Sequence, residues 1–135
     1  MASATILVAD DSGTVRTLVR RALVAAGFQV VTADNGVAAV AQFRQHAPEL
    51  VILDIQMPEM DGYEACQQIL AANLGRRPLP IVFLTRDTAQ HLDALGSELG
   101  AYLPKPVCEQ QLVETVRALL GSFRPASVRQ LENVS

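Results

Sequence analysis

The sequence of 135 residues is poor in aromatic residues, which make up 4% of it, and it contains only two cysteines. Hydrophobic residues nevertheless account for 50% of the chain. One domain can therefore bury a sizeable core, built mainly from aliphatic side chains. The cysteines, Cys66 and Cys108, lie far apart and outside any spacing that is typical of metal ligands. We interpret them as two reduced thiols of a cytoplasmic protein.

Long apolar runs and an excess of basic charge are also missing. No apolar run reaches the roughly 18 residues of a membrane-spanning helix, and the N-terminal stretch MASATILVADDS lacks the basic region of a signal peptide. The 11 basic and 14 acidic residues give a formal net charge of −3. This balance argues against direct nucleic-acid binding through a basic surface. We expect a cytoplasmic protein that contacts neither membrane nor nucleic acid.

The chain does contain short apolar runs that alternate with helical patterns. These runs predict strands at 5–9, 28–33, 50–53, 81–84 and 101–103. The first, third and fourth do not alternate polar with apolar residues, which is typical of strands covered on both faces. Apolar residues spaced by three and four predict five helices, near 15–26, 37–47, 66–70, 92–99 and 112–120. This alternation predicts an α/β fold with a parallel sheet between two layers of helices.

The end of the chain differs from the rest. We expect Gly121 to close the last helix, and residues 122–135 show little apolar periodicity. The sequence therefore predicts a domain over residues 1–121, followed at 122–135 by a C-terminal tail, either a frayed end or the stub of a linker.

Polar residues follow the predicted strands at the points where these strands end. Asp10 and Asp11 follow the first strand, Asp54 the third, Thr85 the fourth and Lys105 the fifth. Parallel strands end at one edge of a sheet, and open α/β sheets bind ligands outside that edge. We therefore expect three carboxylates, a hydroxyl and an ammonium group to lie close together.

Such a cluster requires a cation, because neighbouring carboxylates repel one another and raise each other's pKa. Mg²⁺ prefers oxygen ligands and keeps several waters, so Asp10, Asp11 and Asp54 are candidate magnesium ligands. Asp54 is then the candidate nucleophile toward phosphorus, since aspartyl phosphates are established covalent intermediates. Thr85 and Lys105 are the candidate donors to the phosphoryl oxygens.

The motifs VADDS, LVILDIQMPEMDG, IVFLT and AYLPKP occur in this order between residues 4 and 121. Together they resemble the receiver domain of two-component response regulators. The resemblance implies a flavodoxin-like, doubly wound, five-stranded parallel sheet of order 2-1-3-4-5 with five helices. It also implies Mg²⁺ held by Asp11, Asp54 and the main-chain carbonyl of Gln56, with Asp10 acting mainly through water. The Lys105–Pro106 peptide bond is expected to be cis.

The resemblance further implies that Asp54 accepts phosphate from a histidine of a sensor kinase or phosphotransfer protein. Thr85 and Tyr102 would act as the switch and alter a surface over 87–120. A downstream protein or a fused output domain would read that surface, and two copies could pair through the fourth and fifth helices. Such a module has no turnover substrate and catalyses only its own phosphorylation and dephosphorylation.

Some residues depart from the family's pattern or modulate it. Arg86 stands where a small residue is usual, and we hypothesise that it slows access of small phosphodonors or water to Asp54. Gln56 and Asp87 fall where the family tunes the lifetime of the phosphate. Cys108 replaces a better helix-capping residue.

A basic face on the first helix has two interpretations. Arg16, Arg20 and Arg21 form this face. In the family the corresponding face meets the kinase or phosphotransfer helix, and the alternative is an ordinary solvated surface. His46 and His91 are interpreted as surface residues.

Two alternative functions remain open. One is a Mg²⁺-dependent phosphatase or transferase with an aspartyl nucleophile, against which the adjacency of Asp10 and Asp11 argues, because such enzymes place their two acids two residues apart. The other is a degenerate receiver that acts by binding alone. The full set of site residues argues against it, whereas Arg86 argues for it.

Overall fold

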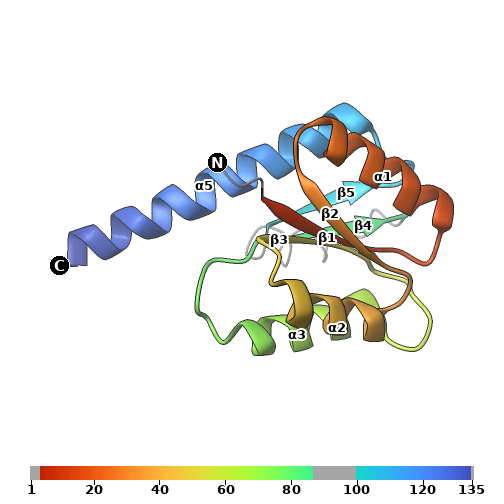
Figure 1. Cartoon of the computed structure of the whole chain (residues 1–135), viewed down its shortest axis with the longest axis horizontal. Helices are drawn as coiled ribbons and strands as arrows, with labels where there is room; N and C mark the ends of the chain where they lie inside the picture. Colours follow the sequence, from red (N-terminus) through yellow and green to blue (C-terminus); the bar gives the residue numbers. More distant parts are fainter. Residues whose placement is uncertain (1–3, 87–99, 135) are drawn as a thin grey trace.

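The computed structural model describes residues 4–86 and 100–134, with side chains up to residue 121. In this part of the chain a single sheet of parallel strands has the order β2-β1-β3-β4-β5 (Figure 1). The predicted α/β fold and strand order are confirmed. The strands are β1 (Thr5–Ala9), β2 (Gln29–Ala33), β3 (Leu50–Asp54), β4 (Ile81–Thr85) and β5 (Gly100–Pro104).

Helices cover both faces of the sheet. Within the described residues they are α1 (Gly13–Ala25), α2 (Gly36–His46), α3 (Gly62–Asn73) and α5 (Glu109–Val134). Helices α1 and α5 contribute to the aliphatic cluster on one face, and α2 and α3 to the cluster on the other. The helix predicted near 92–99, together with Asp87 and His91, lies outside the described residues. None of the described helices combines the length and apolar character that crossing a membrane requires.

The predicted end of the last helix is wrong. Helix α5 continues through Gly121 to Val134 (Figure 1). A glycine costs a helix interior only about 1 kcal/mol relative to alanine, so it stops a helix only where the backbone turns left-handed. Gly27, after α1, does so with a φ of 99°, whereas Gly121 is not among the residues with positive φ. The division into a domain over 1–121 and a tail over 122–135 stays a prediction.

Side-chain caps begin three helices just beyond the strands that precede them. Ser12, Asn35 and Asp61 accept hydrogen bonds from the backbone N–H groups of Val15, Ala38 and Glu64. Each cap satisfies a donor that the first helical turn leaves open. Because these caps follow β1, β2 and β3, they also fix the loops at the edge of the sheet where these strands end.

The loop after β3 folds back tightly against the strand. The backbone N–H of Gly62 donates to the carbonyl of Ile55 at 2.8 Å. A Cβ atom on Gly62 would lie only 2.3 Å from the main-chain oxygen of Asp54. Only glycine therefore allows α3 to begin directly against the end of β3.

We expect Gly62→Ala to lower the free energy of unfolding by about 1 to 3 kcal/mol, because the added methyl group must displace backbone. Chemical denaturation measures this change. The matched control is Gly121→Ala, where no described atom outside the helix's own backbone lies within 4 Å of the new Cβ. This control should stabilise the helix by about 0.5 to 1 kcal/mol. Equal effects of both substitutions would contradict the close approach at Gly62.

Candidate functional site

The ends of the central strands bring four of the predicted site residues together. Asp10 is fully buried after β1, and Asp54 and Thr85, the last residues of β3 and β4, are 5% and 8% exposed. Hydrogen bonds of the sheet continue past the strand ends, since the Lys105 N–H donates to the Thr85 carbonyl at 2.9 Å. Asp11 is exposed beside them. The predicted convergence of acids, hydroxyl and amine at one edge is therefore present in the structure.

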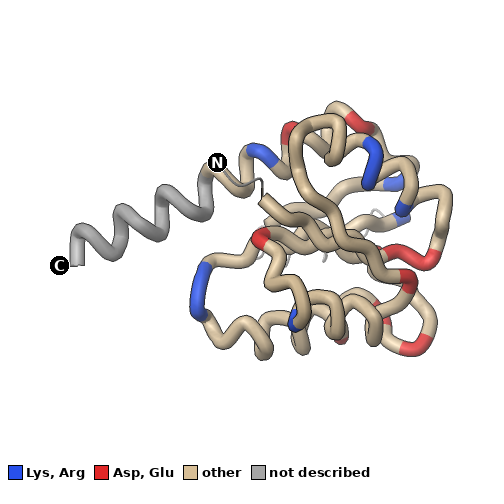
Figure 2. Tube along the Cα trace, in the orientation of Figure 1, with Lys and Arg blue, Asp and Glu red and all other residues tan. Residues whose placement is uncertain are grey.

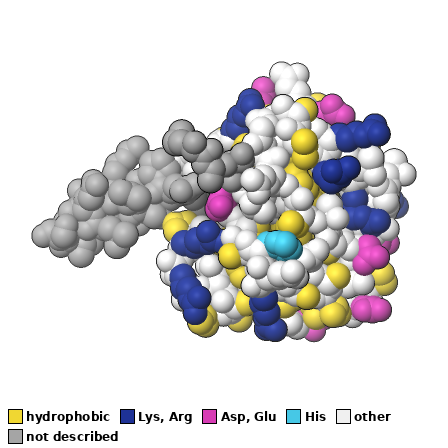
Figure 3. All heavy atoms as spheres, in the orientation of Figure 1, with side chains coloured by type: hydrophobic (Ala, Val, Ile, Leu, Met, Phe, Trp, Pro, Cys, Tyr) yellow, Lys and Arg dark blue, Asp and Glu magenta, His cyan; other side chains and the backbone are white. Residues whose placement is uncertain are grey.

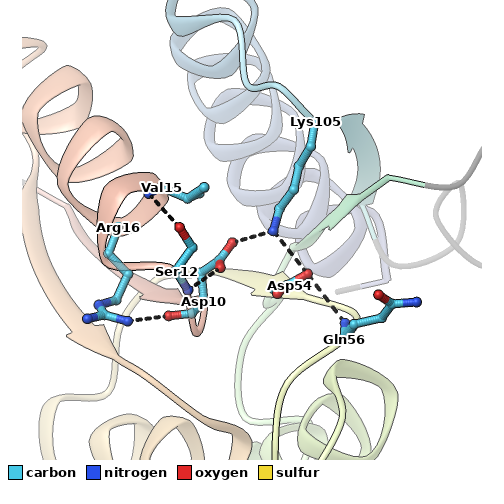
Figure 4. Close-up of polar contacts among 7 residues, drawn as sticks. All are labelled: Asp10, Ser12, Val15, Arg16, Asp54, Gln56 and Lys105. Atoms are coloured by element: carbon cyan, nitrogen blue, oxygen red, sulfur yellow. Dashed lines mark hydrogen bonds and ion pairs between the residues drawn. The ribbon is translucent and has the colours of Figure 1, made fainter.

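Lys105 lies between two buried carboxylates (Figure 4). Its Nζ atom is 2.8 Å from Oδ2 of Asp10 and 3.3 Å from Oδ1 of Asp54, and its side chain is 8% exposed. A buried cation of this kind offsets charge that would otherwise be unpaired. The Lys105–Pro106 peptide bond is cis, as the family resemblance implied.

Backbone groups hold the two carboxylates in place. The Ser12 N–H donates to Oδ1 of Asp10 at 2.9 Å, and the Gln56 N–H donates to Oδ1 of Asp54 at 3.3 Å (Figure 4). The Arg16 guanidinium donates to the main-chain oxygen of Asp10 at 2.6 Å. Arg16 is half-buried, so it belongs to the site rather than to a solvated face, unlike the exposed Arg20. Sequence patterns identified the basic face but not this hydrogen bond.

Burial raises the pKa of Asp54 from 3.8 to about 6, and the negative charge of Asp10 adds to the effect. The Lys105 cation and the Gln56 N–H act in the opposite direction. The carboxylates of Asp10, Asp11 and Asp54 each offer an oxygen atom, and these atoms lie within 4.8 Å of one another. Three convergent oxygen donors are a set that suits a hard divalent cation. The residues present therefore fit the predicted magnesium site.

Tyr102 takes part in an aromatic stack that the sequence analysis missed. Its half-buried ring stacks on that of Phe83, with the ring centroids 5.3 Å apart. The ring of Tyr63 also contacts Phe83, at a tilt, with the ring centroids 5.2 Å apart. Phe83 is opposite Tyr102 in the register of β4 and β5. The stack therefore connects the predicted switch residue to the first turn of α3, and so to the loop after Asp54.

The predicted modulating residues lie around the rim. Gln56 and Arg86 are exposed, while Asp87 falls outside the described residues. Cys108 is exposed and precedes α5, where its main-chain carbonyl accepts a hydrogen bond from the Leu112 N–H at 2.9 Å. Their roles in phosphate lifetime, access and helix capping stay predictions.

The raised pKa of Asp54 predicts how stability depends on pH in metal-free buffer. The folded state holds this proton more tightly than the unfolded chain, so the stabilisation is fully present below pH 3.8 and is lost as the pH rises through about 6. We therefore expect Asp54→Asn to raise the free energy of unfolding at pH 7.5 by about 1 to 3 kcal/mol. This gain over the wild type should vanish below pH 4.

Urea denaturation of both proteins across this pH range measures the gain. The control Glu114→Gln replaces an exposed carboxylate on α5 and should change stability little. A gain from Asp54→Asn that is the same at every pH would contradict the raised pKa.

The chain is similar to known proteins over most of its length. The family model for the response regulator receiver domain matches residues 6–117. The response regulator MprA of Mycobacterium bovis is 37% identical over 125 residues, which cover 91% of this chain and 53% of that protein. MprA of Mycobacterium leprae is 36% identical over 122 residues, covering 89% and 52%. The chain thus spans about half the length of these curated relatives.

Solved structures agree with this similarity. The chemotaxis protein CheY4 of Vibrio cholerae superposes with a TM-score of 0.77 at 30% identity, over 87% of this chain and 99% of that one. The receiver domain of the sensor histidine kinase PA1611 from Pseudomonas aeruginosa gives a TM-score of 0.77 at 28% identity, over 90% and 100%. That structure holds a magnesium ion in its active-site cleft. With its fold, strand order and cluster of acids around Lys105, this chain belongs to the response regulator receiver domain family and is a module of two-component signalling.

Proposed function

We propose that this receiver domain accepts a phosphoryl group on Asp54 in a Mg²⁺-dependent reaction. The observation that carries the proposal is the pairing of Lys105 with two buried carboxylates. One of them belongs to Asp54, the last residue of the central strand β3. The Asp54 carboxylate is held by the sheet and faces the Lys105 cation. It also belongs to the cluster of three acids that suits a divalent metal.

The residues that would hold Mg²⁺ are Asp10, Asp11, Asp54 and the main-chain carbonyl of Gln56. Bound there, the ion would screen the charge of an incoming phosphoryl group and stabilise charge on its oxygens. The magnesium ion in the cleft of the PA1611 receiver supports this assignment.

The chain's own groups perform the remaining tasks. An oxygen of Asp54 attacks phosphorus, and the bond between phosphorus and the donor's histidine nitrogen breaks. A pKa of about 6 leaves Asp54 mainly ionised at neutral pH, as a nucleophile must be. Lys105 would donate to one phosphoryl oxygen, and the Thr85 hydroxyl would donate to another.

The proposed partners follow from the family. A sensor histidine kinase or phosphotransfer protein would approach over α1, where a groove of about 480 Å³ lies between that helix and the start of α5. Arg21 and Glu109 line this groove. The change at Thr85 would reach Tyr102 and a surface that includes β5 and α5. A downstream protein, a fused output domain or a second copy of the chain would read that surface. We place the module in the cytoplasm, and no turnover substrate is proposed.

Incubation with Mg²⁺ and acetyl phosphate tests this function. We expect one acid-labile phosphoryl group per chain by intact-mass measurement, because Asp54 is the proposed acceptor. It should be absent in Asp54→Asn and strongly reduced with a metal chelator. Repeated turnover of a phosphate ester would instead favour an aspartyl phosphatase. A wild-type protein that stays unmodified would favour a receiver that acts by binding alone.

Arg86 provides a second test. We expect Arg86→Ala to accept phosphate from acetyl phosphate faster and to lose it faster, by about two- to tenfold, because a long exposed cation next to Thr85 is removed. Single-turnover kinetics measure both rates. Substitution of the exposed Arg20 on α1 by alanine is the matched control and should leave both rates unchanged with this small donor. Unchanged rates in Arg86→Ala would exclude a role in access.

A further inference from the structure

A second pocket lies at the opposite edge of the sheet from Asp54. It has a volume of about 340 Å³ and is formed where α2 and α3 end, which is the edge at which the parallel strands begin. We call it the arginine pocket, and its lining residues are Phe43, Arg44, Ala47, Ala72, Asn73, Arg76 and Arg77. Figure 2 shows basic positions at this edge, and Figure 3 shows basic side chains over the same helix ends.

One of the three arginines builds the wall of the pocket. The Arg77 guanidinium donates to the main-chain oxygens of Ala47 and Pro48, the latter at 2.8 Å. The buried Asn73 side chain donates to the main-chain oxygen of Arg77 at 2.9 Å. These bonds tie the loop after α3 to the end of α2. The pocket therefore has a defined shape before anything binds to it.

The other two arginines have no anionic partner. Arg44 and Arg76 are exposed, and within the described residues no carboxylate forms an ion pair with any of the three. Cations near helix C-termini do interact favourably with the helix dipole, but this effect is confined to the last turn and is screened by solvent. Arg77 already occupies the carbonyls beyond α2. Two exposed cations, Arg44 and Arg76, in a chain of net charge −3 are thus available to an acidic partner.

Leu74, next to the pocket, points to the same conclusion. It is 70% exposed, and its φ of 55° lies in the left-handed region that favours glycine or asparagine at the end of a helix. A leucine in this conformation strains the backbone, and its exposed side chain offsets little of that cost by packing within the domain. Leu74 directly follows the lining residue Asn73, and the half-buried Ala72 also lines the pocket, so apolar side chains accompany the two unpaired cations at the end of α3.

We propose that the arginine pocket docks an acidic amphipathic segment of a partner protein. Carboxylates of that segment would pair with Arg44 and Arg76, since guanidinium groups bind carboxylates in a bidentate manner. An apolar side chain of the same segment would pack on Leu74 and Ala72. The net charge of −3 disfavours a long polyanion, which favours a protein segment over nucleic acid. This surface lies away from Asp54, so the proposal does not depend on phosphorylation.

A labelled synthetic peptide tests the proposal. The probe is an amphipathic helix with leucine on one face and glutamate on the other, and its binding to the full chain is followed by fluorescence anisotropy at low ionic strength. We expect the Arg44→Glu/Arg76→Glu double variant to bind it about tenfold more weakly, because two ion pairs are replaced by repulsion. Leu74→Gly should bind about fivefold more weakly, although its Tm is equal to or higher than that of the wild type.

The matched control is the Arg20→Glu/Arg117→Glu double variant, which makes the same charge change at exposed positions of α1 and α5 and should leave peptide affinity within twofold of the wild type. Peptide binding that is absent, or that is lost in this control instead, would overturn the proposal. So would equal binding of a peptide with lysine in place of glutamate. Tighter binding of a DNA duplex or of pyrophosphate at the arginine pocket would overturn it as well, in favour of a phosphate ligand.

Discussion

The interaction on which the site depends is the contact of one ammonium group with two buried carboxylates. Lys105 reaches Asp10 and Asp54 only because β1, β3 and β5 run parallel and end at the same edge. Without that cation the two carboxylates would repel each other in a region from which water is largely excluded. The parallel topology brings the two acids close together, and the same topology supplies the lysine that offsets their repulsion.

The sequence predicted this arrangement because its signals are local and repeated. Each apolar run is followed by a polar residue, and parallel pairing alone places those residues side by side. The strand order, the buried Asp54 and the position of Lys105 follow from that pattern and from the family motifs. Short apolar runs of this kind also predicted the strand bounds to within a residue or two.

What the sequence did not predict depends on side-chain direction or on small energy differences. The hydrogen bond from Arg16 to the Asp10 carbonyl requires knowing how the first turn of α1 sits over the loop. The stack of Tyr63, Phe83 and Tyr102 joins three elements that have no common sequence signal. Helix α5 passes Gly121 because a single glycine in a helical conformation is only weakly unfavourable.

Helices α2 and α3 extend from one functional edge to the other. Both begin at loops next to the acidic cluster, and both end at the arginine pocket. A Cβ atom on Gly36, at the start of α2, would lie 2.3 Å from the main-chain oxygen of Met60. This approach ties the start of α2 to the loop after β3, so the two helices form one rigid layer between the edges.

The position of Lys105 in the chain has a consequence for biosynthesis. A ribosome releases Asp10 and Asp54 long before it releases the lysine that neutralises them, because β5 is the last strand of the sheet. Until that strand docks, two acids face each other at the rim of an incomplete sheet. The cluster is thus completed only when nearly the whole sheet has emerged, so a nascent or truncated chain carries the two acids without the cation that offsets their charge.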